Sequence, residues 1–290
     1  MANDRKVALI VGANGGVGAP VTRRLASDGY DVVVVGRSCN AVVGGPKSFP
    51  GSRITLTDLA EEISVMGRKV YVISIDVTNE GSVQKMVSWT AENHGGFDVF
   101  VWLPSVFRPG AVDGFPLRSF DLMANISARA PLIAAQAALP HLRERNGRIV
   151  FISPPLHAKA APFGSVYLWS KYLQTMLAEA ITAESGGKVF GAAIWPDWIL
   201  QTEATTGTWP DKVMRKPEML ADAIAQFLRM DSAALRSHGS TLWTDVELLG
   251  LADINDLTTY DVVPGSNPPP LCLDMAERGL TAAAKYMLRR

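Results

Sequence analysis

Residues 7–18, VALIVGANGGVG, are a short apolar run that passes into a glycine-rich turn. A continuous apolar run of this length is typical of a strand buried on both faces of a sheet. An amphipathic helix is predicted over 18–28 and a second apolar strand over 31–35. Strand, glycine turn, helix and strand in this order form a βαβ unit, whose crossover is right-handed.

The rest of the chain continues this alternation. Further strands are predicted at 69–75, 97–103, 148–152, 188–195 and 239–243, and helices at 56–66, 81–94, 117–141, 162–184, 218–230 and 273–288. Pro131 is expected to kink the long helix that contains it. The order predicts an α/β protein with a Rossmann-like, doubly wound parallel sheet of about seven strands in three layers, α/β/α. We expect one dinucleotide-binding domain over 1–290, with a substrate lid at about 200–217 and a C-terminal extension at about 260–290.

The composition limits the classes of partner. Hydrophobic residues make up 48% of the 290 residues and charged residues 19%, which is enough apolar material for a large core. Basic and acidic residues are equal at 28 each, so we expect no nucleic-acid or membrane partner. The two cysteines, Cys39 and Cys272, match no metal-ligand spacing and fit a reducing compartment. With no apolar run long enough for a signal peptide or a membrane span, a cytoplasmic location is expected.

The glycine turn predicts a phosphate site. Gly12, Gly16 and Gly18 follow the first strand at its junction with a helix, where backbone N–H groups and the helix dipole hold a pyrophosphate. The spacing is G-x-x-x-G-x-G and differs from the commoner G-x-G-x-x-G fingerprint. Asn14 and Val17 within the turn are expected to contact the cofactor as well. The alternative is a glycine turn that binds nothing.

The ends of the second and third strands bear on the choice of cofactor. An NAD site usually has an acidic residue after the second strand, and here Arg37 follows instead. A guanidinium matches phosphate geometry, so NADP(H) is favoured over NAD(H); the alternative is a solvated loop arginine. Asp76, at the end of the third strand, is expected to accept a hydrogen bond from the adenine amino group, or else to cap the next helix.

Tyr167 and Lys171 are four residues apart in a predicted helix and therefore lie on the same face. A free phenol has a pKa near 10, and a neighbouring cation lowers it. A tyrosine with a lowered pKa exchanges protons with a carbonyl or alcohol oxygen. The spacing alone is weak evidence, because most such pairs occur by chance.

In combination these motifs resemble the short-chain dehydrogenase/reductase family over most of the chain. The residues that carry the resemblance are, in order, the glycine turn, Asp76-Val77, Asn125, Ser153, Tyr167, Lys171, Pro196 and Thr202. The resemblance implies that Tyr167 is the general acid/base and that Lys171 binds the nicotinamide ribose and lowers the tyrosine pKa. It implies that Asn125 holds a water linking Lys171 to solvent.

The resemblance extends to the cofactor and to assembly. It implies that Val77, Pro196, Ile199 and Thr202 contact the cofactor, the last two at the nicotinamide carboxamide. It also implies a homotetramer or homodimer built on the helices 117–141 and 162–184. The cofactor would perform the redox chemistry while the protein positions it.

Three departures from the family pattern affect the site. Trp102-Leu-Pro-Ser105 stands where the family has Asn-Asn-Ala-Gly. The usual catalytic serine position falls on Pro154, and Ser153 lies one residue earlier, where a strand turns its side chain to the opposite face. Ser153 is kept as a catalytic candidate, with a strand-end hydroxyl as the alternative. Asp197 replaces the usual glycine after Pro196, as a loop residue or, less favoured, as a polar anchor for substrate.

Aromatic residues gather near the expected substrate mouth, which suits a bulky hydrophobic small molecule. They are Trp102, Trp169, Trp195, Trp198 and Trp209, of which Trp102, Trp198 and Trp209, together with His157, are the substrate candidates. The alternative is that most of these rings belong to the core. The predicted function is an NADP-preferring oxidoreductase that interconverts an alcohol and a carbonyl. The alternatives are a cofactor-binding protein without turnover, and a non-redox dehydratase or cyclase on the same scaffold.

Overall fold

A seven-stranded parallel sheet is the centre of the protein. The computed structural model describes residues 5–40, 54–108, 110, 112–153, 161–207 and 209–270. The strands lie in the order β3-β2-β1-β4-β5-β6-β9, and every neighbouring pair is parallel. Their bounds are β1 (Val7–Val11), β2 (Asp31–Gly36), β3 (Val70–Ser74), β4 (Val99–Trp102), β5 (Arg148–Ile152), β6 (Phe190–Trp195) and β9 (Leu242–Thr244). The predicted Rossmann-like sheet is confirmed.

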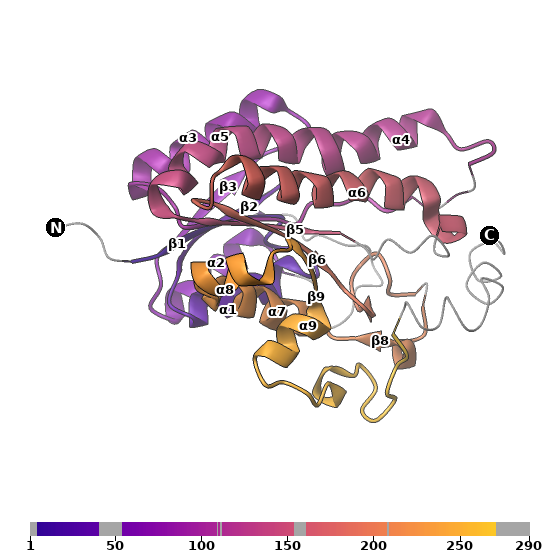
Figure 1. Cartoon of the computed structure of the whole chain (residues 1–290). Coiled ribbons are helices and arrows are strands. Elements are labelled where there is room, and N and C mark those ends of the chain that lie inside the picture. The colour runs from indigo at the N-terminus through magenta and orange to yellow at the C-terminus, as the bar shows by residue number, and fades with distance from the viewer. Residues whose placement is uncertain are drawn as a thin grey trace.

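Helices cover both faces of the sheet (Figure 1). One layer contains α3 (Glu80–His94), α4 (Leu117–Ala124), α5 (Ala130–Arg145) and α6 (Ala161–Glu184). The other contains α1 (Gly18–Ser27), α2 (Leu56–Val65), α7 (Glu218–Arg229), α8 (Ser232–His238) and α9 (Asp245–Leu251). Because side chains alternate along a strand, β1 sends Ala8 and Ile10 into the core under α1 and α7, and Leu9 into the core under α3 and α5.

The sheet order places the site. Neighbours of β1 are β2 on one side and β4 on the other, so the chain order reverses at the boundary between β1 and β4. In open α/β sheets, ligands bind in the crevice at the carboxyl ends of the strands at such a switch point. The glycine turn begins at that end of β1.

The prediction of a single α-helix over 117–141 is wrong in detail. The chain forms α4, then a π-helical turn over Asn125–Arg129, then α5. Pro131 lies in the first turn of α5, directly after this π-helical turn.

The C-terminal part contains two helices that were not predicted, α8 and α9. Each is held by a cap: Asp231 accepts from the backbone N of Ala234, and Thr244 forms a capping box with Glu247. The predicted lid contains a parallel pair of short strands, β7 (Ile199–Leu200) and β8 (Met214–Arg215), and a 3₁₀ turn, η3 (Asp211–Val213). The helix expected at 273–288 lies outside the described residues.

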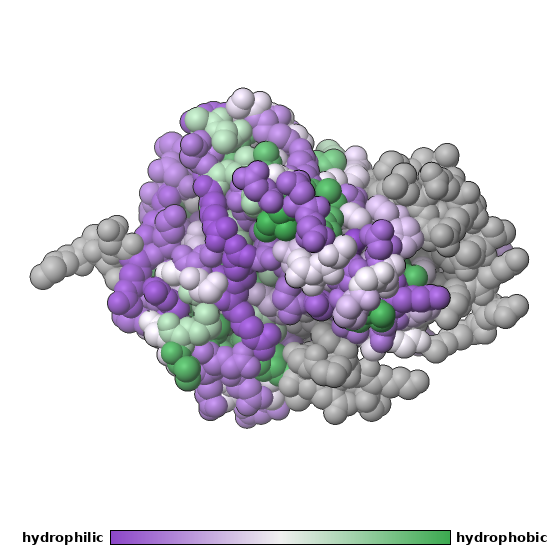
Figure 2. All heavy atoms as spheres, turned by 90° about the horizontal axis from the view of Figure 1, so that it is seen from below, coloured by the Kyte–Doolittle hydropathy of each residue, from purple (hydrophilic) through white to green (hydrophobic). Residues whose placement is uncertain are grey.

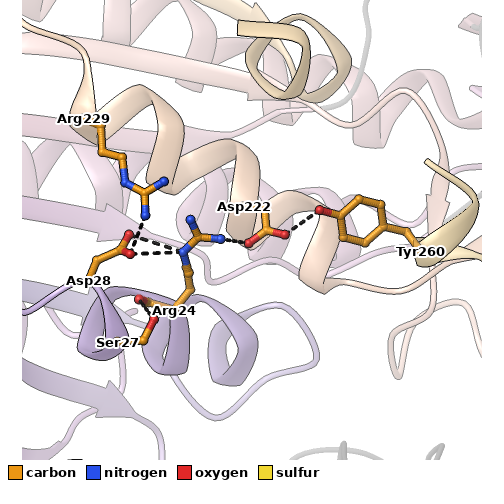
Figure 3. A network of polar contacts seen from close by, with 6 residues as sticks. All are labelled: Arg24, Ser27, Asp28, Asp222, Arg229 and Tyr260. Atoms are coloured by element: carbon orange, nitrogen blue, oxygen red, sulfur yellow. Dashed lines mark hydrogen bonds and ion pairs between the residues drawn. The ribbon is translucent and has the colours of Figure 1, made fainter. Parts of the chain in front are cut away.

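A polar network joins the segment after α9 to the helical layer (Figure 3). The Asp222 carboxylate of α7 accepts from the guanidinium of Arg24 and from the hydroxyl of Tyr260 in the 3₁₀ turn η4 (Thr258–Tyr260). Arg24 and Arg229 both contact Asp28, so α1 and α7 are tied together at their ends. The network fixes the segment that follows α9 against α7.

The outer surfaces of the two layers differ. The face formed by α1, α2 and α7–α9 is mostly hydrophilic, with smaller apolar groups between the charged residues (Figure 2). The opposite layer exposes large apolar side chains on α4, α5 and α6: Leu122, Leu132, Trp169, Leu173 and Met176. Over the described part of the chain, no helix combines the length and apolar character that crossing a bilayer requires.

Candidate active site

The turn after β1 is built so that only glycine fits at two positions. Gly12 has φ +82°, a left-handed conformation, and an added Cβ would lie 3.2 Å from the backbone N of Pro104. A Cβ on Gly18 would lie 2.0 Å from the carbonyl oxygen of Gly12. The backbone N–H of Gly12 donates to the carbonyl of Val35 over 2.8 Å, which ties the turn to the end of β2. The backbone of the turn is therefore open to a ligand at the start of α1.

A cleft of ≈420 Å³ runs over this turn. Nine of the predicted cofactor residues line it: Gly12, Asn14, Gly16, Val17, Gly18, Arg37, Asp76, Val77 and Thr202. The amide nitrogen Nδ2 of Asn14 is buried without a hydrogen-bond partner. Such a buried, unpaired donor is typical of a position that binds a ligand. The glycine-lined cleft and the unpaired donor fit a dinucleotide.

Asp76 contributes its carboxylate to the cleft but does not cap a helix. Asn79 is the N-cap of α3, so the capping alternative for Asp76 is wrong. Asp76 accepts hydrogen bonds from the backbone N and the hydroxyl of Thr78, and these bonds, followed by the charge of Arg37, lower its pKa. Asp76 is therefore a carboxylate exposed to the cleft.

One carboxylate lies where a phosphate is expected. Oε2 of Glu203, in the lid, accepts from the backbone N of Gly16 over 3.0 Å, while Oε1 is buried without a partner. Burial raises the pKa of Glu203. The sequence reasoning missed Glu203, because the lid has no periodicity that would show which of its residues reaches the glycine turn.

A second cavity of ≈320 Å³ adjoins the cleft and shares four lining residues with it: Val17, Leu103, Ser105 and Thr202. The other four predicted cofactor residues line this cavity: Tyr167, Lys171, Pro196 and Ile199. The rest of the wall is largely apolar, with Phe107, Ile152, Leu200 and Leu220. The glycine cleft and the tyrosine cavity therefore adjoin each other at these four residues.

Tyr167 projects from α6 into the second cavity. Its hydroxyl lies 3.4 Å from the hydroxyl of Ser105, and its ring meets the ring of Phe107 edge-on at 4.9 Å. Burial raises the pKa of Tyr167, and the bond with Ser105 opposes that effect. The lowering of the tyrosine pKa that was expected from Lys171 is therefore not what this structure shows.

Lys171 explains the difference. Its side chain is 3% exposed, and Nζ donates to Oε1 of Gln174 over 2.9 Å, a neutral partner. Burial lowers the pKa of Lys171 to about 7. A lysine that is partly neutral at pH 7 is a weak source of positive potential for Tyr167. Gln174 carried no signal in the sequence beyond its position one turn after Lys171.

Ser153 does not face the tyrosine cavity. Its hydroxyl is fully buried and donates to the backbone carbonyl of Lys171 over 2.9 Å. Side chains one residue apart on a strand point to opposite faces, and Ser153 follows β5 with its side chain toward α6. The expected catalytic role of Ser153 is wrong; it anchors the Tyr/Lys helix to the sheet. Pro154 and His157 lie outside the described residues.

Of the three tryptophans predicted to contact substrate, two line the tyrosine cavity and one does not. Trp102 is fully buried in the core under α3 and α5. The predicted substrate contact of Trp102 is therefore wrong, because its ring at the end of β4 points toward the layer that contains α3 and α5. Trp198 and Trp209 do line the tyrosine cavity. Trp169 is 62% exposed and stacks on Phe120, and Trp195 donates to the hydroxyl of Thr175.

Trp198 is held in the cavity wall by the C-terminal segment. Its Nε1 donates to the carbonyl of Pro268 over 2.8 Å, and the guanidinium of Arg215 lies 4.7 Å from its ring centre. Arg215 forms a buried ion pair with Asp261 at 2.7 Å. The wall of the cavity therefore depends on the lid strand β8 and on the segment after α9 together.

Two further candidates lie outside both cavities. Asn125 begins the π-helical turn and lines a separate surface groove beside α6, with its Oδ1 buried and unpartnered; the amine of Lys171 bonds to Gln174. Asp197 donates through its backbone N to the carboxylate of Asp245, as a loop residue does. Within the described residues, no group of three or more His, Cys, Asp or Glu side chains forms a metal site.

The fold and the two joined cavities define a nucleotide-binding α/β protein of the Rossmann type. The model of the short chain dehydrogenase family matches residues 6–212, and the chain belongs to this family of oxidoreductases. The resemblance read from the glycine turn, Tyr167 and Lys171 is thereby confirmed at the level of the family.

Relatives and solved structures agree with this assignment. The chain is 29% identical to hydroxysteroid dehydrogenase-like protein 2 of Xenopus tropicalis, over 96% of this chain and 68% of the relative. It is 26% identical to the human protein of the same name, over 89% of this chain and 60% of the relative. The chain thus spans roughly two thirds of the length of these relatives.

Among solved structures, a short chain dehydrogenase of Mycobacterium thermoresistibile has a TM-score of 0.79 at 29% identity, covering 91% of this chain and 93% of its own. A short chain dehydrogenase of Burkholderia cenocepacia, solved in complex with NADP, has a TM-score of 0.68 at 25% identity. That comparison covers 82% of this chain and 95% of the Burkholderia protein.

Proposed function

We propose that the protein is an NADP(H)-preferring oxidoreductase that interconverts an alcohol and a carbonyl on a bulky hydrophobic small molecule. The observation that carries the proposal is that the glycine cleft adjoins the cavity lined by Tyr167 and Lys171 and shares four lining residues with it. The NADP complex of the Burkholderia relative supports the choice of cofactor.

The residues of the cleft would hold the cofactor in order along its length. Arg37 and Asp76 would bind the adenosine end, the backbone of the glycine turn the pyrophosphate, and Ile199 and Thr202 the nicotinamide end. Bound there, the nicotinamide supplies or accepts the hydride. The protein contributes position and electrostatics.

Tyr167 would exchange a proton with the substrate oxygen. Its hydroxyl belongs to a cavity whose wall is mainly apolar, which excludes water and favours a substrate with a large apolar body. Trp198 and Trp209 in that wall offer flat surfaces for such a body. The lid between β7 and β8 would cover it.

The proposal is tested by titrating the protein with NADPH, followed through cofactor fluorescence, and then by measuring NADPH consumption with aromatic and terpenoid carbonyls. We expect binding and carbonyl-dependent consumption. Binding without consumption by any carbonyl would contradict turnover, and a product formed without a change in cofactor redox state would indicate a non-redox enzyme.

Arg37→Ala is expected to weaken NADP binding about tenfold and to leave NAD binding unchanged, because an exposed charge-assisted contact with the 2′-phosphate is lost. The measurement is the ratio of the two dissociation constants. Arg23→Ala is the control, since Arg23 is a half-buried arginine that pairs with Glu62 and does not line the cleft. If Arg37→Ala keeps the NADP preference, the phosphate assignment fails.

We also propose that copies of the chain assemble through the exposed apolar face of α4, α5 and α6. A contiguous apolar surface on a helical layer is typical of a protein interface. Leu173→Glu combined with Met176→Glu should convert the oligomer to a monomer, measured as molar mass by light scattering. Val65→Glu, at an exposed apolar residue on α2, is the control. An unchanged mass in the double variant would exclude this face.

Glu203 favours a second candidate, a protein that holds a dinucleotide weakly and does not turn over. Its carboxylate bonds to the Gly16 N–H that a pyrophosphate would use. Carbonyl-dependent consumption of NADPH separates the two candidates, because only the oxidoreductase turns over.

A further inference from the structure

We propose that Ser105 is a further catalytic residue, whose hydroxyl holds the substrate oxygen beside Tyr167. The inference deepens the proposed function and rests on it. Two observations carry it: Ser105 Oγ lies 3.4 Å from Tyr167 Oη, and Ser105 lines both the glycine cleft and the tyrosine cavity. It therefore stands at the junction where a substrate oxygen would meet the phenol and the cofactor together.

Ser153, which also lies close to α6, bonds to a different group. The Ser153 hydroxyl is fully buried and donates to the Lys171 carbonyl, and Ser153 is not among the residues that line the cavity. Ser105 is exposed and lies just beyond the carboxyl end of β4, which ends at Trp102. Of the hydroxyl groups described in this cavity, Thr202 and Thr205 bond to each other, whereas Ser105 bonds to Tyr167.

The chemistry needs a hydroxyl at this place. When a carbonyl is reduced, its carbon accepts a hydride from the reduced cofactor, which is thereby oxidised, and its oxygen accepts the proton of Tyr167. The negative charge left on the phenol oxygen is neutralised by a proton from water. Ser105 donates a hydrogen bond to the oxygen that carries charge, first on the substrate and then on Tyr167, and such a bond favours the charged form.

Reaction rates give the first test. Ser105→Ala should lower kcat about tenfold to a hundredfold, the cost of one donor to a developing oxyanion, without changing the dissociation constant of NADPH. Ser105→Thr keeps the hydroxyl and should restore most of the rate. Ser64→Ala, at an exposed serine of α2 that lines neither cavity, is the control and should stay within about twofold of the wild type.

The titration of Tyr167 gives the second test, in cofactor-free protein labelled with ¹³C at the tyrosine Cζ and followed by NMR. Because the Ser105 bond opposes the rise in the Tyr167 pKa, Ser105→Ala should raise this pKa further and Ser64→Ala should not. The rising limb of the pH profile for alcohol oxidation should move to higher pH in the same variant, since oxidation requires the phenolate.

An unchanged kcat or an unchanged Tyr167 pKa in Ser105→Ala would overturn the proposal. If the wild type reduces no carbonyl, the proposed function fails, and the NMR titration still decides whether Ser105 acts on Tyr167.

Discussion

Tyr167→Phe is expected to lower kcat for carbonyl reduction by about 10²- to 10⁴-fold, the usual contribution of a positioned general acid. The ring remains, so its edge-on contact with Phe107 and the shape of the cavity are kept. Only the hydroxyl that meets Ser105 is removed. We expect the dissociation constant of NADPH to change by less than about twofold, because the lost group serves proton transfer and not cofactor binding.

The measurement is steady-state NADPH consumption with a carbonyl that the wild type reduces, together with a fluorescence titration of cofactor binding. Tyr172→Phe is the matched control, on the same helix but with an exposed side chain. A Tyr167→Phe variant with wild-type kcat would remove Tyr167 from the chemistry. A variant with lost rate and lost cofactor affinity would assign it to binding.

Glu203→Gln is expected to tighten NADP binding about tenfold, and Glu203→Ala by up to about a hundredfold. The carboxylate occupies the N–H of Gly16, where a pyrophosphate would bind, and it repels a second anion at that place. Glutamine keeps the size of the side chain and removes the charge, whereas alanine removes both the charge and the competing acceptor.

The measurement is a calorimetric titration with NADP at several pH values. It also shows in which direction the affinity changes with pH. Burial raises the pKa of Glu203, so the carboxylate is neutralised as the pH falls through that raised pKa. Binding to the wild type should therefore tighten toward acid pH relative to Glu203→Gln, in which this dependence is absent. Glu218→Gln, at an exposed residue, is the control. Unchanged or weaker binding in Glu203→Gln would show that the carboxylate does not compete with the cofactor.

Much of the fold is predictable because its signals are local. The apolar runs of β1 and β2 and the glycine turn between them fix a βαβ unit without reference to the rest of the chain. α8 and α9 were missed because helices of 7 residues span about two turns and give too short a period to recognise. The π-helical turn at Asn125–Arg129 has no sequence signature comparable to that of a proline or a cap.

The site is predictable where residues share an element and unpredictable where separate segments meet. Tyr167 and Lys171 were found because one helix fixes their spacing. Ser105, Glu203 and Gly16 come from three segments, and only the packed structure shows which of them touch. Trp102 shows another limit. Side chains alternate between the two faces of β4, but both faces of this strand are buried. The sequence pattern therefore does not indicate which face is nearer the ligand.

The most direct test of the account is a crystal structure of the protein with NADP bound. We predict that the pyrophosphate lies on the backbone of the glycine turn with Glu203 displaced from Gly16, and that the nicotinamide ring lies in the cavity beside the hydroxyls of Tyr167 and Ser105. A nicotinamide ring outside that cavity, or a Tyr167 hydroxyl turned away from it, would contradict the account.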